Sequence, residues 1–115
     1  MNAFNQSLLG PKEPRVERDR ERLAAVAGLP CCICWEWEMQ QNSRTEVHHC
    51  KSGRYGRNRA PDCMTIPLCH SHHNKLRPYP GDEGKIGFHN GQETWEGLYG
   101  LDTDWISWTE ERIGQ

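Results

Sequence analysis

Apolar residues occur in short groups separated by polar, glycine-containing or proline-containing stretches, which predicts short helices and strands. The first group, within residues 15–27, mixes valine, leucine and alanine with Arg-Glu pairs and suits a charged helix. Gly28 and Pro30 follow directly, and both are typical of a helix end. We expect an N-terminal helix that packs its apolar face on the rest of the domain.

Two more groups, near the C-terminus, also have helical spacing. Residues 92–99 and 102–113 each combine tryptophan with leucine or isoleucine. Asp102 is the expected N-cap of the second helix and Gly114 its expected C-cap. The aromatic side chains of this region are most simply interpreted as packing in the core or in a lid, rather than as platforms for stacked bases.

The middle of the chain predicts strands followed by a helix. Residues 35–39 and 45–50 are β-prone and flank the polar turn 40–43, which predicts a β-hairpin. Pro67 is well placed as the first residue of a helix that extends to residue 75 or 76. Five of the six histidines of the chain gather at the end of the second strand and on this helix.

The fold class follows from this pattern and from the size of the chain. A chain of 115 residues with 35% hydrophobic residues has room for one compact domain with a modest apolar core. Residues 1–14 contain a glycine, two prolines and few apolar side chains, so we expect a flexible N-terminal arm. The sequence predicts a single α+β domain over residues 15–115.

Six cysteines in so short a chain indicate either a disulfide framework or metal thiolates. The first residues lack the charged and apolar regions of a signal peptide. No stretch of about 18 apolar residues could span a membrane. We therefore expect a reducing, cytoplasmic setting without a membrane partner, in which cysteines serve as metal ligands.

The formal net charge of -2 hides a strong asymmetry along the chain. Residues 44–77 carry seven basic and two acidic side chains, whereas residues 82–115 carry two basic and eight acidic ones. The basic block contains a glycine-rich loop expected over residues 51–61, which can approach a sugar-phosphate backbone closely. Four residues of this loop are the expected DNA contacts: Lys51, Arg54, Arg57 and Arg59.

One group of potential ligands has the spacing of a structural zinc site. Cys31 and Cys34 form a Cys-x-x-Cys pair, although Cys32 with Cys34 is an alternative. Cys69 and His72 are three residues apart and share one face of the predicted helix. These residues predict a closed Cys₃His site for Zn²⁺, which would stabilise so small a domain.

The remaining histidines point to a second ion. His73 follows His72 directly, so it is rotated by about 100° around the predicted helix and faces elsewhere. His48 and His49 are the nearest candidate partners, and His89 is left over. Neutral imidazoles suit a divalent metal, and an imidazole is also a suitable base. Alternation along a strand would send His48 and His49 to opposite faces, so both can serve one site only if the strand bends.

The order of these motifs resembles the HNH (ββα-metal) endonuclease family. Cys-x-x-Cys, Val-His-His, a Gly/Arg-rich loop, an aspartate and Ile-Pro-Leu-Cys-x-x-His-His cover residues 29–73. The continuation Phe-His-Asn-Gly, followed by Trp-Glu and Tyr-Gly, is similar to the phage-borne, Ref-like subgroup of RecA-dependent nucleases and extends the likeness to Tyr99. The resemblance implies a small ββα-metal domain with a structural zinc.

The resemblance also implies roles for individual residues. His49 matches the general base, and Asp62 is the nearest substitute for the asparagine that orients it. Three histidines match or complete the ligand set of a catalytic divalent ion, which is Mg²⁺, Mn²⁺ or Zn²⁺: His48, His73 and His89.

The expected function is metal-dependent hydrolysis of DNA phosphodiester bonds by a phage or prophage endonuclease that depends on a RecA filament. The alternative is a zinc-stabilised DNA-binding or recruitment module that never cuts. That alternative accounts for the Cys₃His set and the basic loop, but it leaves His48, His49 and His89 without a role.

Overall fold

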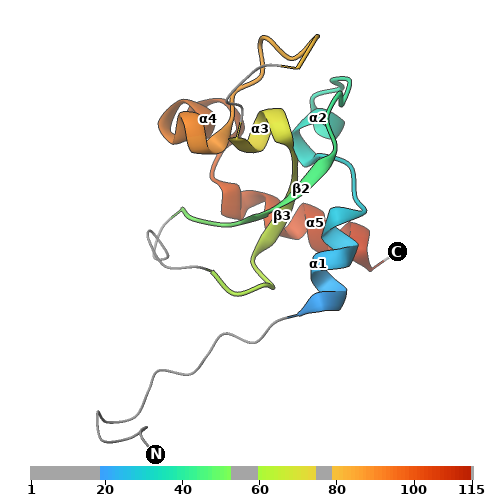
Figure 1. Cartoon of the computed structure of the whole chain (residues 1–115). Coiled ribbons are helices and arrows are strands. Elements are labelled where there is room, and N and C mark those ends of the chain that lie inside the picture. Colours follow the sequence, from blue (N-terminus) through green and yellow to red (C-terminus); the bar gives the residue numbers. More distant parts are fainter. Residues whose placement is uncertain (1–18, 53–59, 75–78, 115) are drawn as a thin grey trace, which may run out of the picture.

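The computed structural model describes residues 19–52, 60–74 and 79–114. Its centre is a two-stranded antiparallel sheet of β2 (Thr45–His49) and β3 (Thr65–Cys69), which places Val47 opposite Pro67 and His49 opposite Thr65. Helix α3 (His70–Asn74) follows β3 without a break. The fold is therefore α+β (Figure 1). Its strand-strand-helix unit carries five of the six histidines of the chain.

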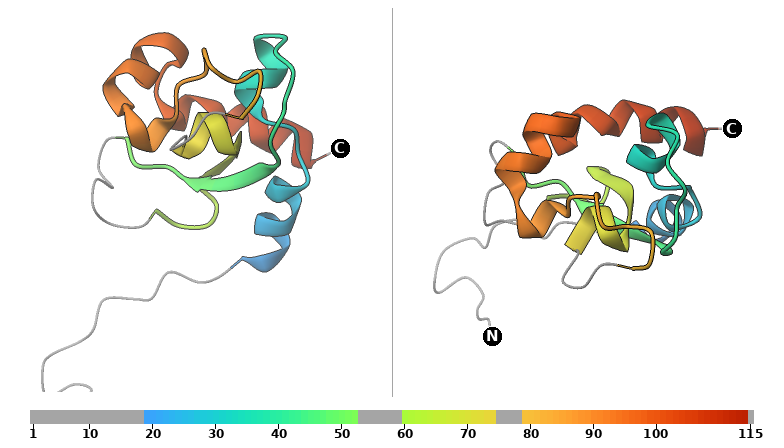
Figure 2. Two further views of the ribbon diagram at one scale, coloured as in Figure 1. Left: turned by 45° about the horizontal axis from the view of Figure 1, so that its top comes forward. Right: turned by 90° about the horizontal axis from the view of Figure 1, so that it is seen from above.

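Short helices surround this unit. On the N-terminal side are α1 (Arg20–Ala27) and α2 (Cys32–Glu36). The C-terminal part contains two 3₁₀ helices, η3 (Phe88–Asn90) and η4 (Asp102–Trp105), and two α-helices, α4 (Gln92–Tyr99) and α5 (Ile106–Ile113). Helix α1 packs on both strands, α2 packs on β3, and α5 packs on α1 and β3 (Figure 2). The last helix of the chain thus returns to the sheet and packs on β3.

The apolar core lies where α2, β3 and α4 meet. Ile33, Ile66 and Leu68 are fully buried there. Trp95 of α4 packs edge-on against Phe88, with ring centroids 5.2 Å apart, and its indole Nε1 donates a hydrogen bond of 3.1 Å to the carbonyl of His72. This one side chain therefore fixes α4 and η3 against α3, where the histidines are.

Several predicted elements agree with the structure. Helix α4 covers residues 92–99 as predicted, and Gly114 is the C-cap of α5. The predicted N-terminal arm, residues 1–14, and the first residues of the predicted helix 15–27 lie outside the described residues. Among the described residues, no helix is both long enough and apolar enough to cross a membrane.

The predicted hairpin of residues 35–39 with 45–50 is wrong. Trp35 and Glu36 belong to α2, and the chain leaves that helix through Glu38, whose φ is 54°. The strand at 45–49 pairs instead with residues 65–69. Cys32, Ile33 and Cys34 are buried by a helical turn, and a short run of apolar residues alone does not distinguish such a turn from a strand.

The predicted helix start at Pro67 is also wrong, because Pro67 lies in the middle of β3 and the helix starts at His70. All five residues of β3 are buried. A strand that is buried on both faces lacks the alternation of apolar and polar residues that a strand with one solvent face shows. In a two-stranded sheet each strand keeps one unpaired edge, where a proline removes no ladder hydrogen bond. Cys69 therefore ends a strand and does not begin a helix.

We expect Trp95→Ala to lower the free energy of unfolding by about 3–5 kcal/mol, because it leaves a large cavity beside α3 and removes the hydrogen bond to the His72 carbonyl. The matched change Trp35→Ala removes a ring that is 59% exposed and should stay within about 0.5 kcal/mol of the parent. Urea unfolding of the zinc-loaded protein followed by circular dichroism measures both. Equal losses for the two variants would contradict this packing.

Candidate functional site

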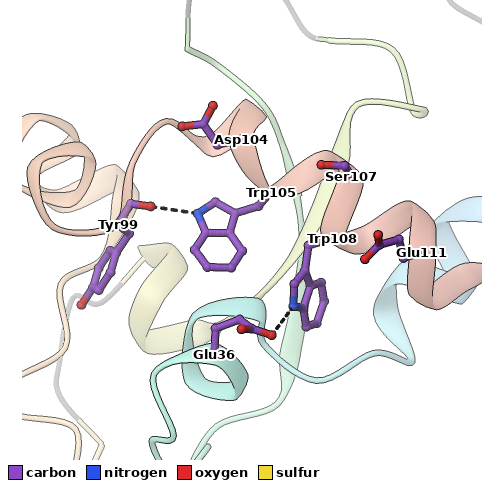
Figure 3. A pocket seen from close by; sticks show the side chains of 7 residues that line it. All are labelled: Glu36, Tyr99, Asp104, Trp105, Ser107, Trp108 and Glu111. Atoms are coloured by element: carbon purple, nitrogen blue, oxygen red, sulfur yellow. Dashed lines mark hydrogen bonds between the residues drawn. The ribbon is translucent and has the colours of Figure 1, made fainter.

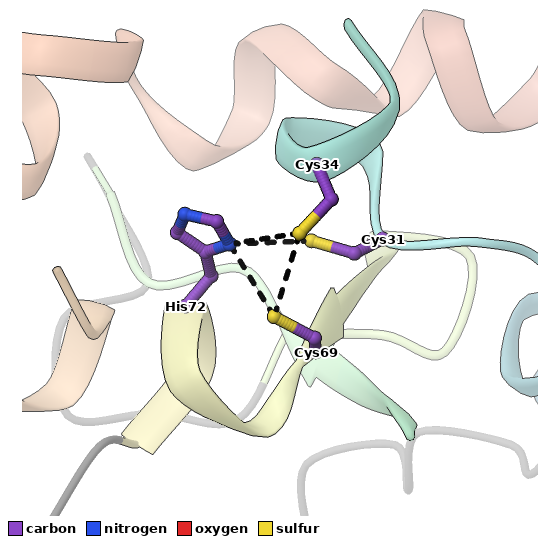
Figure 4. Close-up of side chains that lie close together, drawn as sticks. All are labelled: Cys31, Cys34, Cys69 and His72. Atoms are coloured by element: carbon purple, nitrogen blue, oxygen red, sulfur yellow. Dashed lines mark hydrogen bonds between the residues drawn. The ribbon is translucent and has the colours of Figure 1, made fainter. Parts of the chain in front are cut away.

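Four side chains from three separate segments converge in the interior (Figure 4). Cys31 and Cys34 come from the start of α2, Cys69 ends β3, and His72 lies one turn further on in α3. All four are buried. The structure thus brings together the four residues that the sequence analysis grouped, and it places Cys31 rather than Cys32 in the cluster.

The spacing of these atoms matches tetrahedral coordination. His72 Nδ1 lies 3.5 Å from the Sγ atoms of Cys31 and Cys34 and 3.3 Å from that of Cys69. The sulfurs of Cys34 and Cys69 are 3.8 Å apart. One Zn²⁺ at about 2.3 Å from sulfur and about 2.0–2.1 Å from nitrogen gives S···S of about 3.8 Å and S···N of about 3.5 Å in a tetrahedron. The cluster can therefore hold a metal such as zinc.

The pKa values of the cysteine thiols in this cluster also bear on cation binding. Burial raises the pKa of the Cys31 thiol, whereas hydrogen bonds from Cys31 and Cys34 hold the pKa of Cys69 far below its ordinary value. The Cys31 hydrogen bond lowers the pKa of Cys34, but the hydrogen bond to Cys69 and burial outweigh it and raise this pKa to about 11. Three thiolates this close together in the interior need a positive charge at their centre.

A buried lysine contributes part of that charge. Lys85 Nζ lies 3.4 Å from Cys34 Sγ and 2.9 Å from a carboxylate oxygen of Asp82. Burial alone would lower the pKa of Lys85, but Asp82 and the thiolates raise it, so the ammonium stays charged. All six cysteines, each within the described part of the chain, are free thiols.

A second cluster consists of three histidines from three elements. His48 lies on β2, His73 on α3 and His89 on η3, and one ring nitrogen from each falls within 4.8 Å of the other two. Their ring centroids are 4.9–5.4 Å apart. His72 and His73 are thus neighbours in α3 whose side chains belong to different clusters.

Two of these histidines are held by carboxylates. His48 Nε2 is 2.8 Å from Asp102 Oδ2, and His73 Nδ1 is 2.8 Å from Glu46 Oε1. These contacts leave Nδ1 of His48 and Nε2 of His73 for a ligand, and Nδ1 of His48 is buried without a hydrogen-bond partner among the described residues. Metal-bound histidines commonly donate their second N–H to a carboxylate in this way. The donor set therefore fits a divalent ion.

The electrostatics of the cluster favour neutral imidazoles. Burial lowers the pKa values of His48, His73 and His89 below the ordinary value. Burial would raise the pKa of Asp102, but hydrogen bonds from His48 and from the Lys51 amide lower it overall. Three uncharged rings, two of them backed by ionised carboxylates, are suitable ligands at neutral pH.

Sequence reasoning missed both carboxylates. Glu46 is two residues before His48 on β2 and so shares its face, which is a signal that strand alternation could have provided. Asp102 was expected to cap a helix, but Leu101 is the N-cap residue of η4 and Trp105 that of α5. The side chain of Asp102 is instead fully buried on His48.

His49, the last residue of β2, does not join the three-histidine cluster. Its Nε2 lies 2.8 Å from Asp62 Oδ1, and its side chain is 20% exposed. The other carboxylate oxygen of Asp62 accepts a hydrogen bond of 2.8 Å from the backbone N–H of Asp19, so the start of α1 helps to fix Asp62. The result is a half-exposed imidazole oriented by a buried carboxylate.

The expected DNA contacts fall mostly outside the described residues, since Arg54, Arg57 and Arg59 lie in the 53–59 stretch. Lys51 is described, and its backbone N–H donates to Asp102. A separate hollow is lined by residues of α2, α4, η4 and α5 (Figure 3). Its walls include Trp105 and Trp108, whose indole N–H groups donate to the Tyr99 carbonyl and to Glu36.

The model of the family described as "Recombination enhancement, RecA-dependent nuclease" matches residues 15–114. No curated protein and no solved structure matches the chain significantly.

We expect Cys69→Ser to lower the zinc content by one ion per chain and to reduce thermal stability, because it removes a ligand of the Cys₃His cluster. Cys63→Ser is the matched control, since Cys63 is an exposed free thiol outside the cluster. Mass spectrometry of the metals in purified protein measures the difference. Unchanged zinc content in Cys69→Ser would contradict the assignment of the cluster.

Proposed function

Since the chain belongs to the family of RecA-dependent nucleases, whose model spans residues 15–114, we propose that it is a metal-dependent HNH endonuclease that hydrolyses DNA phosphodiester bonds. The observation that carries this proposal is that β2 ends in two histidines, of which His48 belongs to the three-histidine cluster and His49 is oriented by Asp62. A nuclease needs an ion at the phosphate and a base for water, and these residues can supply both.

The arrangement of the elements supports the HNH (ββα-metal) assignment. Strands β2 and β3 and helix α3 follow one another in the chain and pack together. The first strand ends with His48 and His49, and the helix carries His73. The segment between the strands carries the basic residues that would bind phosphate groups. The Cys₃His cluster behind α3 would hold the structural zinc.

In this proposal His49 accepts a proton from the attacking water as the new P–O bond forms. Asp62 keeps the imidazole oriented and stabilises it when it is protonated, and the bond to the leaving oxygen then breaks. A divalent ion held by His48, His73 and His89 would stabilise the negative charge on the scissile phosphate and the leaving oxygen. The basic residues of the loop would hold the flanking phosphates in register.

The family description also implies the conditions of the reaction. A RecA-dependent nuclease acts on nucleic acid and involves RecA, so the proposed substrate is DNA that carries a RecA filament. We propose a phage or prophage origin and action in the cytoplasm of a bacterial host, as the motif pattern of the sequence implies. The purified chain alone is then expected to cut slowly.

We expect His49→Ala to lower the rate of DNA cleavage by about 10²- to 10⁴-fold while fold, zinc content and DNA binding are retained, because only the base is lost. The control His70→Gln changes a histidine outside both clusters and keeps a hydrogen-bond donor for Glu46. Nicking of a plasmid is measured with and without RecA filament, with Mg²⁺, Mn²⁺ or Zn²⁺, and with chelator.

Near wild-type cleavage by His49→Ala in a contaminant-free preparation would remove His49 from the role of base. Absence of cleavage by the wild-type chain under every metal and filament condition, with DNA binding intact, would instead support a zinc-stabilised binding module.

A further inference from the structure

Asp102 lies far from the sheet in sequence but directly behind the histidine cluster in space. It is fully buried, and 54 residues separate it from His48. Its Oδ2 lies 2.8 Å from His48 Nε2 and accepts a hydrogen bond of 2.7 Å from the Lys51 amide. Its Oδ1 accepts a hydrogen bond of 3.2 Å from the Ser52 amide. One carboxylate thus contacts a cluster histidine and the two residues that precede the 53–59 stretch.

These contacts determine which nitrogen of His48 carries the proton. Backbone amides can only donate and an ionised carboxylate can only accept, so Asp102 in its ionised form accepts from both amides and from His48. His48 Nε2 must therefore be the donor, and its Nδ1 keeps a lone pair. That Nδ1 is the buried atom without a hydrogen-bond partner among the described residues, on a ring that packs against His73 and His89.

We propose that Asp102 is a positioning residue that fixes the tautomer and orientation of His48 for a divalent ion and ties the start of the basic segment to the same carboxylate. The proposal rests on the function proposed for the three-histidine cluster. It makes ion binding depend on a buried carboxylate that also accepts hydrogen bonds from the backbone of Lys51 and Ser52. The C-terminal third of the chain is thereby part of the metal site although it supplies only one of its ligands.

The neighbouring contacts explain why Asp102 should matter more than Glu46. Glu46 is half-buried and is shared between His70 and His73. Asp102 is inaccessible to water, so no solvent molecule can replace it as the acceptor for His48. Ser52 has a second anchor, because its Oγ donates a hydrogen bond of 2.8 Å to Glu96 of α4. The backbone near Ser52 should therefore keep its place when Asp102 is changed conservatively.

The test is titration of Co²⁺ alone into the full-length chain after its thiolate cluster has been filled with zinc. Asp102→Asn should weaken Co²⁺ binding by about 10- to 100-fold without changing the zinc content. Asp104→Asn is the matched control, because Asp104 is exposed on the same 3₁₀ helix and accepts a hydrogen bond from the Leu101 amide. Affinity of Asp102→Asn within about twofold of wild type, or an equal loss in Asp104→Asn, would overturn the proposal.

A second measurement uses the wild-type chain and needs no variant to fold. Long-range ¹H–¹⁵N correlation spectra of the zinc-filled chain without Co²⁺ should show His48 protonated at Nε2 and unprotonated at Nδ1. The opposite tautomer would overturn the proposal. Neither readout measures cleavage, so a chain that fails to cut DNA but shows both results would refute the proposed nuclease function and keep the role of Asp102.

Discussion

The structure depends on the strand-to-helix junction at Cys69 and His70, where one short turn presents ligands in two directions. Consecutive residues of a helix are rotated by about 100°, so His72 and His73 cannot serve the same ion. His72 faces the cysteines of α2, whereas His73 faces His48 and His89. The thiolate cluster therefore holds α2, β3 and α3 together, and the position of His73 follows from that anchor.

Buried hydrogen bonds connect other elements of the chain to this junction. Trp95 donates to the carbonyl of His72, and Asp102 contacts His48. Asp62 contacts His49 and accepts a hydrogen bond from the amide of Asp19, the N-cap of α1. Each contact joins an element distant in sequence to a histidine or its neighbour. A domain with so small an apolar core gains its order from polar contacts that are satisfied in the interior, and those contacts are centred on the proposed chemistry.

Local spacing was enough to group the ligands, because Cys-x-x-Cys and Cys-x-x-His close a tetrahedral site whether Cys69 ends a strand or begins a helix. Local spacing was not enough to predict the secondary-structure elements that carry these residues. Pro67 was predicted to start a helix. A proline is tolerated in a strand when its nitrogen faces an unpaired edge, and the sequence does not tell which strands pair. Asp102 looked like a cap because its partner is 54 residues away, and a single sequence has no signal for such a contact. Asp62 was named from a motif, and the structure adds its contact with His49.

The two-ion arrangement is tested most directly by anomalous X-ray diffraction at the zinc absorption edge, using crystals of the chain saturated with zinc. We expect two separate peaks. One should lie among the sulfurs and His72 Nδ1, and the other should lie among the rings of His48, His73 and His89. A single peak between His72 and His73, or a zinc-free thiolate cluster with its sulfurs joined in disulfides, would contradict the account.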